Sequence, residues 1–211
     1  MSVEAGGPTL PTSEDLPDEG VPRKPRADGQ RNRERLLEAA KAAFADAGSD
    51  VSLEEIARRA GVGIGTLYRH FPTRDAIVEA VYRREVLQLA DSAVRLLGLL
   101  PAGEALHEWM RLFVDYIATK KVIASALGSI VGGLSELYAS SGALITNAMS
   151  MLVERAIASG DIRPDVDPAD LLRALVGFTY GAASPGWQSS ALRLIAILMD
   201  GLRPQRGPNL L

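Results

Sequence analysis

The stretch VSLEEIARRAGVGIGTLYRHF, residues 51–71, constrains the fold more than any other part of the chain, because it encodes two helices in quick succession. Ser52 and Glu55 have the spacing of a capping box, in which a serine and a glutamate satisfy free amide groups at a helix start. Val51 and Ile56, on either side of that start, have the spacing of a hydrophobic staple. These signals predict a short helix that begins directly after Ser52.

A second short helix follows a turn that is rich in glycine. Gly61 is expected to end the first helix, the Gly-Val-Gly sequence to form a tight turn, and a new helix to run from about Ile64 to His70. Leu67 and Phe71 lie four residues apart, so both can face the interior of such a unit. The segment therefore predicts a helix-turn-helix.

The other face of this second helix carries groups that suit DNA. Gly65, Thr66 and Arg69 are expected to face outward. Arginine pairs bidentately with guanine, threonine bonds to bases or phosphate, and Tyr68 and His70 can donate to phosphate. A glycine inside a helix costs about 1 kcal/mol relative to alanine. That cost is understandable where a partner such as a DNA groove approaches the backbone closely.

Two other interpretations compete with DNA binding. The run of glycines suggests a dinucleotide-binding loop, but Thr66 stands where the third glycine would be, and the preceding residues have a helical pattern instead of a strand pattern. Alternatively, Tyr68 and His70 are core or surface residues of a simple helical hairpin, which their spacing also permits.

Helical patterns flank this segment on both sides. Residues 1–28 lack apolar periodicity and are expected to form a disordered leader, whereas apolar residues recur at helical spacing from Arg31 to Gly48. The net charge is −3, but basic residues gather at the end of the leader. Arg31 and its neighbours fit either a solvated disordered tail or a basic arm that leads into a DNA-binding head. On the other side, Thr73 caps a long helix that continues to the sequence GLLPAGE.

Beyond Pro101 the pattern stays helical, with no alternating strand pattern and no internal repeat. One helix is expected to end near Lys120, and one or two apolar helices to precede Gly160. A helix capped by Asp167 follows, and a last helix runs from about 188 to 202. The sequence thus predicts an all-α protein.

Composition and spacing argue against several functions. Without cysteine the chain has no disulfide, no thiol nucleophile and no cysteine-based zinc site, and its only histidines, His70 and His107, are far apart. It has no Gly-x-Ser-x-Gly elbow and no plausible pairing of nucleophile and base, so we do not expect an enzyme. The acidic start does not read as a signal peptide, and no apolar run reaches the roughly 18 residues of a membrane span. We expect a cytoplasmic protein without metal, cofactor or membrane partner.

Together these motifs resemble the DNA-binding head of the TetR/AcrR family of bacterial repressors. The resemblance covers roughly residues 30–80 and rests on FADAG at the end of the first helix and on VSLEEIARRAGVGIGTLYRHFPTRDAI. It implies contacts with the major groove from Gly65, Thr66 and Arg69, and contacts with the phosphate backbone from Tyr68, His70, Arg74 and the region around Ser52. Glu54 carries a negative charge at a position near the DNA where a basic residue would be favourable. We therefore expect the first helix of the pair to contribute little to base recognition.

The resemblance also implies a three-helix head with a helix-turn-helix, followed by a helical-bundle regulatory and dimerisation domain. The expected divisions are a leader over 1–28, a DNA-binding domain over 29–80, a ligand-binding and dimerisation domain over 81–203 and a flexible tail over 204–211. A homodimer, held by the last two helices, would bind a near-palindromic double-stranded operator and repress transcription.

A small-molecule effector is the remaining implied partner. Because buried charge is scarce in the second domain, we expect an apolar or aromatic molecule. The candidate pocket residues, each of which could equally be an ordinary core residue, are Trp109, Phe113, Tyr116, Leu137, Tyr138, Asn147, Met151, Phe178 and Tyr180. The alternative function is a helical protein-interaction module that does not bind DNA specifically.

Overall fold

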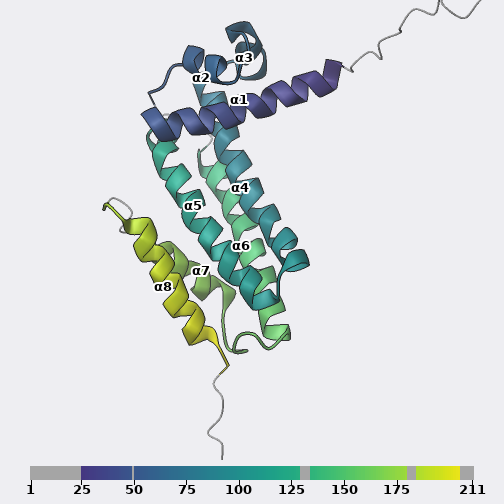
Figure 1. Ribbon diagram of the computed structural model, residues 1–211, viewed down its shortest axis with the longest axis vertical. Coiled ribbons are helices and arrows are strands. Elements are labelled where there is room, and N and C mark those ends of the chain that lie inside the picture. Colours follow the sequence, from purple (N-terminus) through teal and green to yellow (C-terminus); the bar gives the residue numbers. More distant parts are fainter. Residues whose placement is uncertain (1–24, 49, 129–133, 180–183, 205–211) are drawn as a thin grey trace, which may run out of the picture.

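Helices make up the regular structure of this chain, as Figure 1 shows for the computed structural model, which describes residues 25–48, 50–128, 134–179 and 184–204. No strand occurs in these ranges, so the predicted all-α fold is confirmed. In chain order the helices are α1 (Pro25–Ala47), α2 (Leu53–Arg59), α3 (Ile64–His70), α4 (Arg74–Leu99), α5 (Ala102–Gly128), α6 (Leu134–Ala158), α7 (Pro168–Phe178) and α8 (Trp187–Leu202).

The head consists of α1, α2, α3 and the start of α4. Its core contains the buried side chains of Leu36, Phe44, Ile56 and Leu67. α2 packs against α1 and against α3, and Figure 1 shows α1 lying across the upper end of α4 and α5. Because α2 and α3 are too short to be stable alone, their positions depend on the apolar residues that they bury against α1 and α4.

The starts of α2 and α3 follow the sequence signals. The Ser52 side chain accepts a hydrogen bond from the Glu55 amide, and Gly61 takes a positive φ of 65° in the turn, a conformation that glycine adopts without strain. The glutamate half of the predicted capping box does not form, because the Glu55 carboxylate accepts hydrogen bonds from Arg58 and Arg59 instead.

α4 is a single rod that belongs to both the head and the body. Thr73 caps its start by accepting a hydrogen bond from the Ala76 amide. Further along, α4 packs against α5 and α6, and the indole N–H of Trp109 on α5 donates to the carbonyl of Leu89 on α4 at 2.8 Å. The predicted long linking helix is therefore present.

In the body, α4, α5 and α6 each pack against the other two, and α7 and α8 cover them on one side. α7 packs on α6, and α8 packs on α5 (Figure 1). The predicted cap of α7 is confirmed, since the Asp167 carboxylate accepts hydrogen bonds from the amides of Ala169 and Asp170. At the far end of the body the Asp161 carboxylate accepts from the amide of Gly103 and so caps the start of α5.

Some helix ends differ from the sequence prediction. α1 begins at Pro25, so residues 25–28, which were expected in the leader, are helical. Proline is tolerated in a first helical turn, and the positive end of the helix dipole stabilises the negative charge of Asp28 there. α5 continues past Lys120 to Gly128, and the segment before Gly160 is one helix over its described length. The rest of the predicted leader and nearly all of the tail lie outside the described residues. Within the described residues, no helix has both the length and the apolar character needed to span a bilayer.

Candidate nucleic-acid interface

One face of α3 is anchored in the head and the other is open. Leu67 and Phe71 are buried, as predicted from their spacing. Gly65 and Arg69 are exposed, Thr66 is half-buried, and Tyr68 keeps 46% of its surface accessible. The structure therefore brings Gly65, Thr66, Tyr68 and Arg69 together on a surface that the rest of the described chain does not cover.

Gly65 has no structural reason to be glycine. Its φ is not positive, and a Cβ atom placed on it would meet no atom within 4 Å. Neither backbone strain nor packing inside the described chain therefore excludes alanine, which is favoured over glycine in a helix. A reason for glycine has to come from outside the chain.

Charge is distributed differently on the two helices of the pair. On α2, Arg58 and Arg59 both bind Glu55, and Arg59 also binds Asp46 of α1 at 2.6 Å. Hydrogen bonds from Arg58 and then Arg59 lower the pKa of the Glu55 carboxyl from 4.5 to about 2. On α3, by contrast, Arg69 forms no ion pair with any described residue. The charge of Arg69 is thus available to a partner, whereas the charges of α2 are largely neutralised.

Two of the sequence-predicted DNA contacts face inward or act locally. The Arg74 guanidinium donates to the carbonyl of Val51 and lies 6.0 Å from the Phe44 ring centroid. Its Nη2 is buried, without a partner among the described residues. Arg74 thus binds within the head although the residue is only half-buried, and its contact with phosphate stays a prediction. Ser52 is exposed, but its hydroxyl already serves as the α2 cap.

Arginines of α1 lie beside the helix-turn-helix. Arg31 is exposed and pairs with Asp28, one turn earlier. Arg33 lies 5.3 Å from the Phe71 ring centroid, at the end of α3. The Nη1 atom of Arg35 is 4.0 Å from the point that a Cβ on Gly61 would occupy, so this guanidinium borders the turn between α2 and α3. The basic run in the sequence includes Arg35, but only the fold places it next to that turn.

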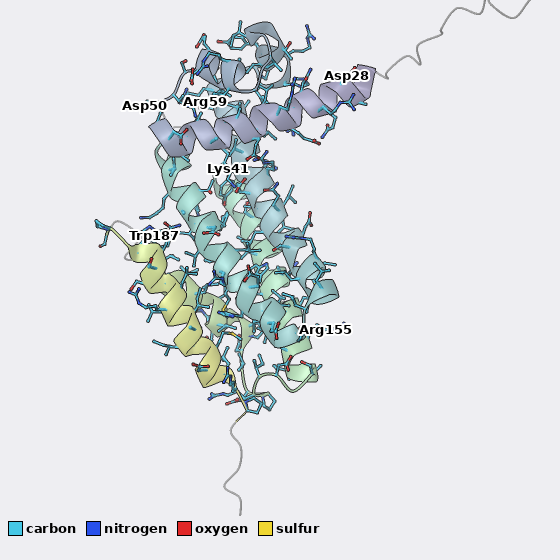
Figure 2. The ribbon with its side chains drawn as sticks, in the orientation of Figure 1. Asp28, Lys41, Asp50, Arg59, Arg155 and Trp187 are labelled. Carbon is cyan, nitrogen blue, oxygen red and sulfur yellow. The ribbon has the colours of Figure 1, made fainter. Side chains whose placement is uncertain are left out.

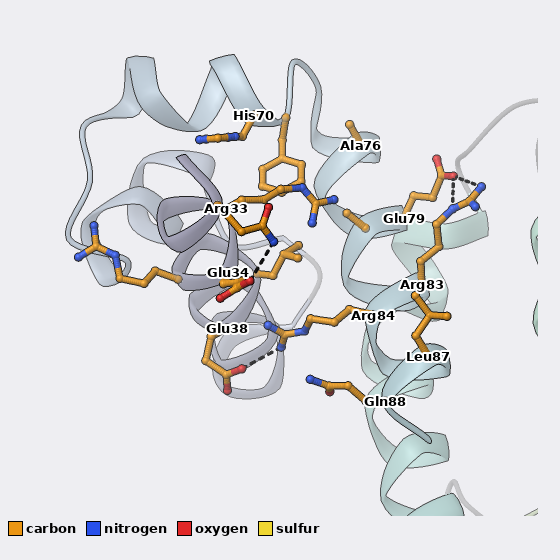
Figure 3. A pocket seen from close by; sticks show the side chains of 15 residues that line it. Arg33, Glu34, Glu38, His70, Ala76, Glu79, Arg83, Arg84, Leu87 and Gln88 are labelled. Atoms are coloured by element: carbon orange, nitrogen blue, oxygen red, sulfur yellow. Dashed lines mark hydrogen bonds and ion pairs between the residues drawn. The ribbon is translucent and has the colours of Figure 1, made fainter. Parts of the chain in front are cut away.

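A groove of about 940 Å³ separates α1 from α4 beside the end of α3 (Figure 3). Two ion pairs occupy it: Arg84 of α4 binds Glu38 of α1 at 2.9 Å, and Arg83 binds Glu79 within α4. Half-buried His70 borders one end, next to Phe71. Because most of its charges are paired with each other, this groove adds little net positive charge to the α3 surface.

The predicted effector residues are divided among several environments. On α5, the rings of Trp109, Phe113 and Tyr116 are buried, with successive centroids 6.0 and 5.7 Å apart, so they pack on one another in the core. On α6, Asn147 is exposed and Met151 is half-buried, and Phe178 of α7 is also half-buried.

The remaining predictions cannot be placed to the same extent. Tyr180 lies outside the described residues, as do the side chains of Leu137 and Tyr138. Of the three ring residues on α5, Tyr116 also borders a cavity of about 510 Å³ between α4 and α5.

In the described part of the chain, no group of three or more histidine, aspartate or glutamate side chains is arranged to hold a metal ion.

Family models match both parts of the chain. Residues 36–81 match the model of bacterial regulatory proteins of the tetR family, and residues 101–204 match the C-terminal domain of SbtR-like transcriptional regulators. The first match contains α2, α3 and the start of α4, and the second contains the body from α5 onward. The two matches leave out the first part of α1 and residues 82–100, which include most of α4.

Solved structures and a curated relative agree with these matches. The TetR transcriptional regulator SCO0520 from Streptomyces coelicolor is 44% identical, with a TM-score of 0.75 over 82% of this chain and 99% of that one. The TetR transcription regulatory protein from Mycobacterium vanbaalenii is 37% identical, with a TM-score of 0.72 over 85% and 99%. The HTH-type transcriptional regulator UidR of Escherichia coli is 26% identical over 86% of this chain and 94% of its own length.

Proposed function

The chain belongs to the TetR family of bacterial regulatory proteins and is a DNA-binding transcriptional regulator, and on that premise we propose that α3 reads its operator in the major groove. The observation that carries this proposal is the open face of α3, where, among the described residues, Arg69 forms no ion pair and a Cβ on Gly65 would meet no atom within 4 Å. Arg69 would bind a guanine edge, Thr66 a base or a phosphate, and the Gly65 backbone would approach the DNA closely.

Phosphate contacts would surround this reading surface. Tyr68 and His70 on α3 supply donors, Arg35 supplies charge beside the turn, and Arg31 lies about one turn earlier on α1. Arg35 takes the place of Arg74, whose guanidinium is bound within the head. These contacts would fix the position of α3 on the duplex and make affinity depend steeply on salt.

The regulator would act as a homodimer formed by α7 and α8. Val176 on α7 and Leu194 and Ile197 on α8 are large apolar side chains with 41%, 38% and 67% of their surface exposed. Leu194 and Ile197 lie three residues apart, so they share one face of α8, and the exposed Gly201 extends that face. Packing this face against its copy would bury it and relate the two α3 helices by a two-fold axis, which requires a near-palindromic operator.

Regulation would come from a small molecule that binds the body. An effector lowers operator affinity only if it binds the body better when the two heads are wrongly placed for DNA. α4 joins head and body as one helix, so a ligand that moves α4 also moves α3. We place the protein in the bacterial cytoplasm, as a repressor without a catalytic role.

The test is selection of bound duplexes from a random double-stranded pool, followed by affinity measurements at several salt concentrations. The variants are Arg69→Ala and Arg155→Ala; the second removes an exposed arginine near the far end of the body (Figure 2) and is the matched charge control. We expect a palindromic winner, a loss of about 1–3 kcal/mol and relaxed base preference for Arg69→Ala, and no change for Arg155→Ala.

Two outcomes would contradict the proposal. If Arg69→Ala retains the affinity and base preference of the unaltered protein, α3 does not read the operator through this residue. If no duplex is enriched at low salt, the helical protein-interaction module becomes the better account of the chain.

A further inference from the structure

A cavity of about 510 Å³ lies where the head meets the body. It is lined by Lys41 of α1 and by residues of α4 and α5. Its apolar surface comes from Leu89, Leu112 and Tyr116, of which Leu89 and Tyr116 are buried. Figure 2 labels Lys41 where α1 crosses the body helices. The volume lies within the range of protein sites for small organic molecules.

The cavity contains an ion pair that joins the head to the body. The Glu85 carboxylate on α4 is buried, with 8% of its side chain exposed, and it accepts a hydrogen bond from the Lys41 ammonium at 2.6 Å. Burial of a carboxylate is unfavourable unless a cation or hydrogen bonds compensate it. Lys41 therefore provides a compensating charge that comes from a different part of the fold than Glu85.

A second link from α1 to α4 adjoins the first. Arg84 binds Glu38 of α1, and the same guanidinium lies 3.5 Å from Glu85. Glu38 has 72% of its side chain exposed, so water screens this link more than it screens the pair of Lys41 and Glu85. The buried pair is thus the stronger constraint on how α1 sits on α4.

The charges at the cavity surface favour a cation. Besides the Lys41 and Glu85 pair, it carries Asp91, Arg95 and Asp115, and none of these three forms an ion pair with a described residue. Two carboxylates against one guanidinium leave a net negative surface. A ligand with one positive charge and an apolar body matches both this charge and the wall of Leu89, Leu112 and Tyr116.

We propose that this cavity is an effector site for small organic cations with an aromatic or aliphatic body, whose ammonium group competes with Lys41 for Glu85. This inference rests on the proposed function, because it identifies the chemical class of the effector and its place in the fold. A bound ammonium would compensate Glu85 and release Lys41, leaving Glu38 and Arg84 as the one ion pair between the described residues of α1 and α4, beside their apolar packing. The head would then change its orientation on α4, which couples ligand binding to operator affinity.

The test uses tryptamine as the cationic probe and indole-3-acetate as its anionic counterpart, titrated into the full-length protein by calorimetry without DNA. Glu85→Gln removes the charge that the probe needs, Lys41→Met removes the internal competitor, and Glu108→Gln removes an exposed carboxylate on α5 that pairs with Arg111 outside the cavity. Circular dichroism checks that each variant remains helical.

We expect tryptamine to bind, to bind about tenfold more weakly to Glu85→Gln because a charge-assisted hydrogen bond is lost, and to bind more tightly to Lys41→Met. The Glu108→Gln variant should match the unaltered protein, and indole-3-acetate should not bind. The proposal would be overturned if tryptamine does not bind, or if the two probes bind equally well. It would also be overturned if Lys41→Met binds tryptamine no more tightly than the unaltered protein.

A second measurement links the site to DNA. With the selected operator duplex, tryptamine should weaken binding by the unaltered protein more than binding by Lys41→Met, in which the competition no longer exists. An equal effect on both proteins would overturn the competition with Lys41. Because the calorimetric measurement contains no DNA, failure of the proposed function would appear separately, as the absence of a selected duplex.

Discussion

Replacing Gly65 with alanine separates a residue's contribution to stability from its contribution to DNA binding. Within the described chain the new methyl group meets nothing within 4 Å, and the backbone is in the ordinary helical region. Alanine in place of a helical glycine stabilises by about 0.5–1 kcal/mol, because it restricts the unfolded chain and favours the helix. For a domain of this size that corresponds to a rise in the melting temperature of about 1–4 °C.

The same methyl group should weaken operator binding. If α3 lies in the major groove with its backbone against the DNA at Gly65, the methyl occupies space that the DNA fills, and overpacking costs about 1–3 kcal/mol, or roughly 5- to 150-fold in affinity. Thermal unfolding and fluorescence anisotropy with the selected duplex measure the two effects. Gly98→Ala, at an exposed glycine near the end of α4 with equally empty surroundings, should stabilise the protein without changing DNA affinity.

The Gly65→Ala variant can contradict the reasoning in two ways. A stabilised protein that binds the operator as tightly as before would show that the DNA does not approach this backbone. A destabilised protein would show that the space around Gly65 is filled in solution, so that the glycine is explained by packing within the chain.

Three further predictions follow from other parts of the molecule. Ile197→Glu should raise the dimer dissociation constant, measured by sedimentation, by about 100-fold or more, because an isologous interface loses two buried side chains that contribute about 1.5–3 kcal/mol each. The control Val94→Glu, at an α4 residue with 62% of its surface exposed, should leave the sedimentation behaviour unchanged. The Glu55 carboxyl should titrate near pH 2 by NMR, and the stability that its low pKa contributes should be complete above about pH 4.5 and lost as the pH falls toward 2, so a midpoint near 4.5 would refute its pairing with the two arginines. Ser52→Ala should destabilise by about 1 kcal/mol through loss of the α2 cap, and recovery of thermal stability in Ser52→Thr would attribute the loss to the hydroxyl.

Local signals in the sequence were sufficient for most of the head. The cap at Ser52, the glycine at 61 and the cap at Thr73 act through neighbouring residues, and the structure confirms all three. The burial of Leu67 and Phe71 also followed from spacing alone. These features depend on contacts within a few residues along the chain, which a sequence displays directly.

The sequence did not display contacts with distant residues, nor contacts that compete with a local pattern. Arg74 donates to Val51 and lies over Phe44, and neither contact can be read from the residues around it. The Glu55 carboxylate accepts hydrogen bonds from Arg58 and Arg59 and not from the Ser52 amide. The capping pattern alone does not say which of these donors the carboxylate will bind. The predicted effector residues stay a prediction, and the cavity proposed above shares only Tyr116 with them, because its lining combines residues of α1, α4 and α5 that are far apart in sequence.

Because α4 is one continuous helix, a small tilt of the helix displaces the head at its start. With 26 residues, the helix is about 39 Å long, and a tilt of about 5° about its far end moves its first residue by roughly 3.4 Å. Only residues 71–73 separate α3 from α4, so there is little slack in which that displacement could be absorbed. In a symmetric dimer the two displacements would add to roughly 7 Å, a substantial mismatch against the about 34 Å repeat of the duplex. Glu85 lies 14 residues, or about 21 Å, from that pivot, so a displacement of about 1.8 Å beside it becomes about 3.4 Å at the first residue of α4. The displacement of each head would thus be nearly twice the adjustment at Glu85.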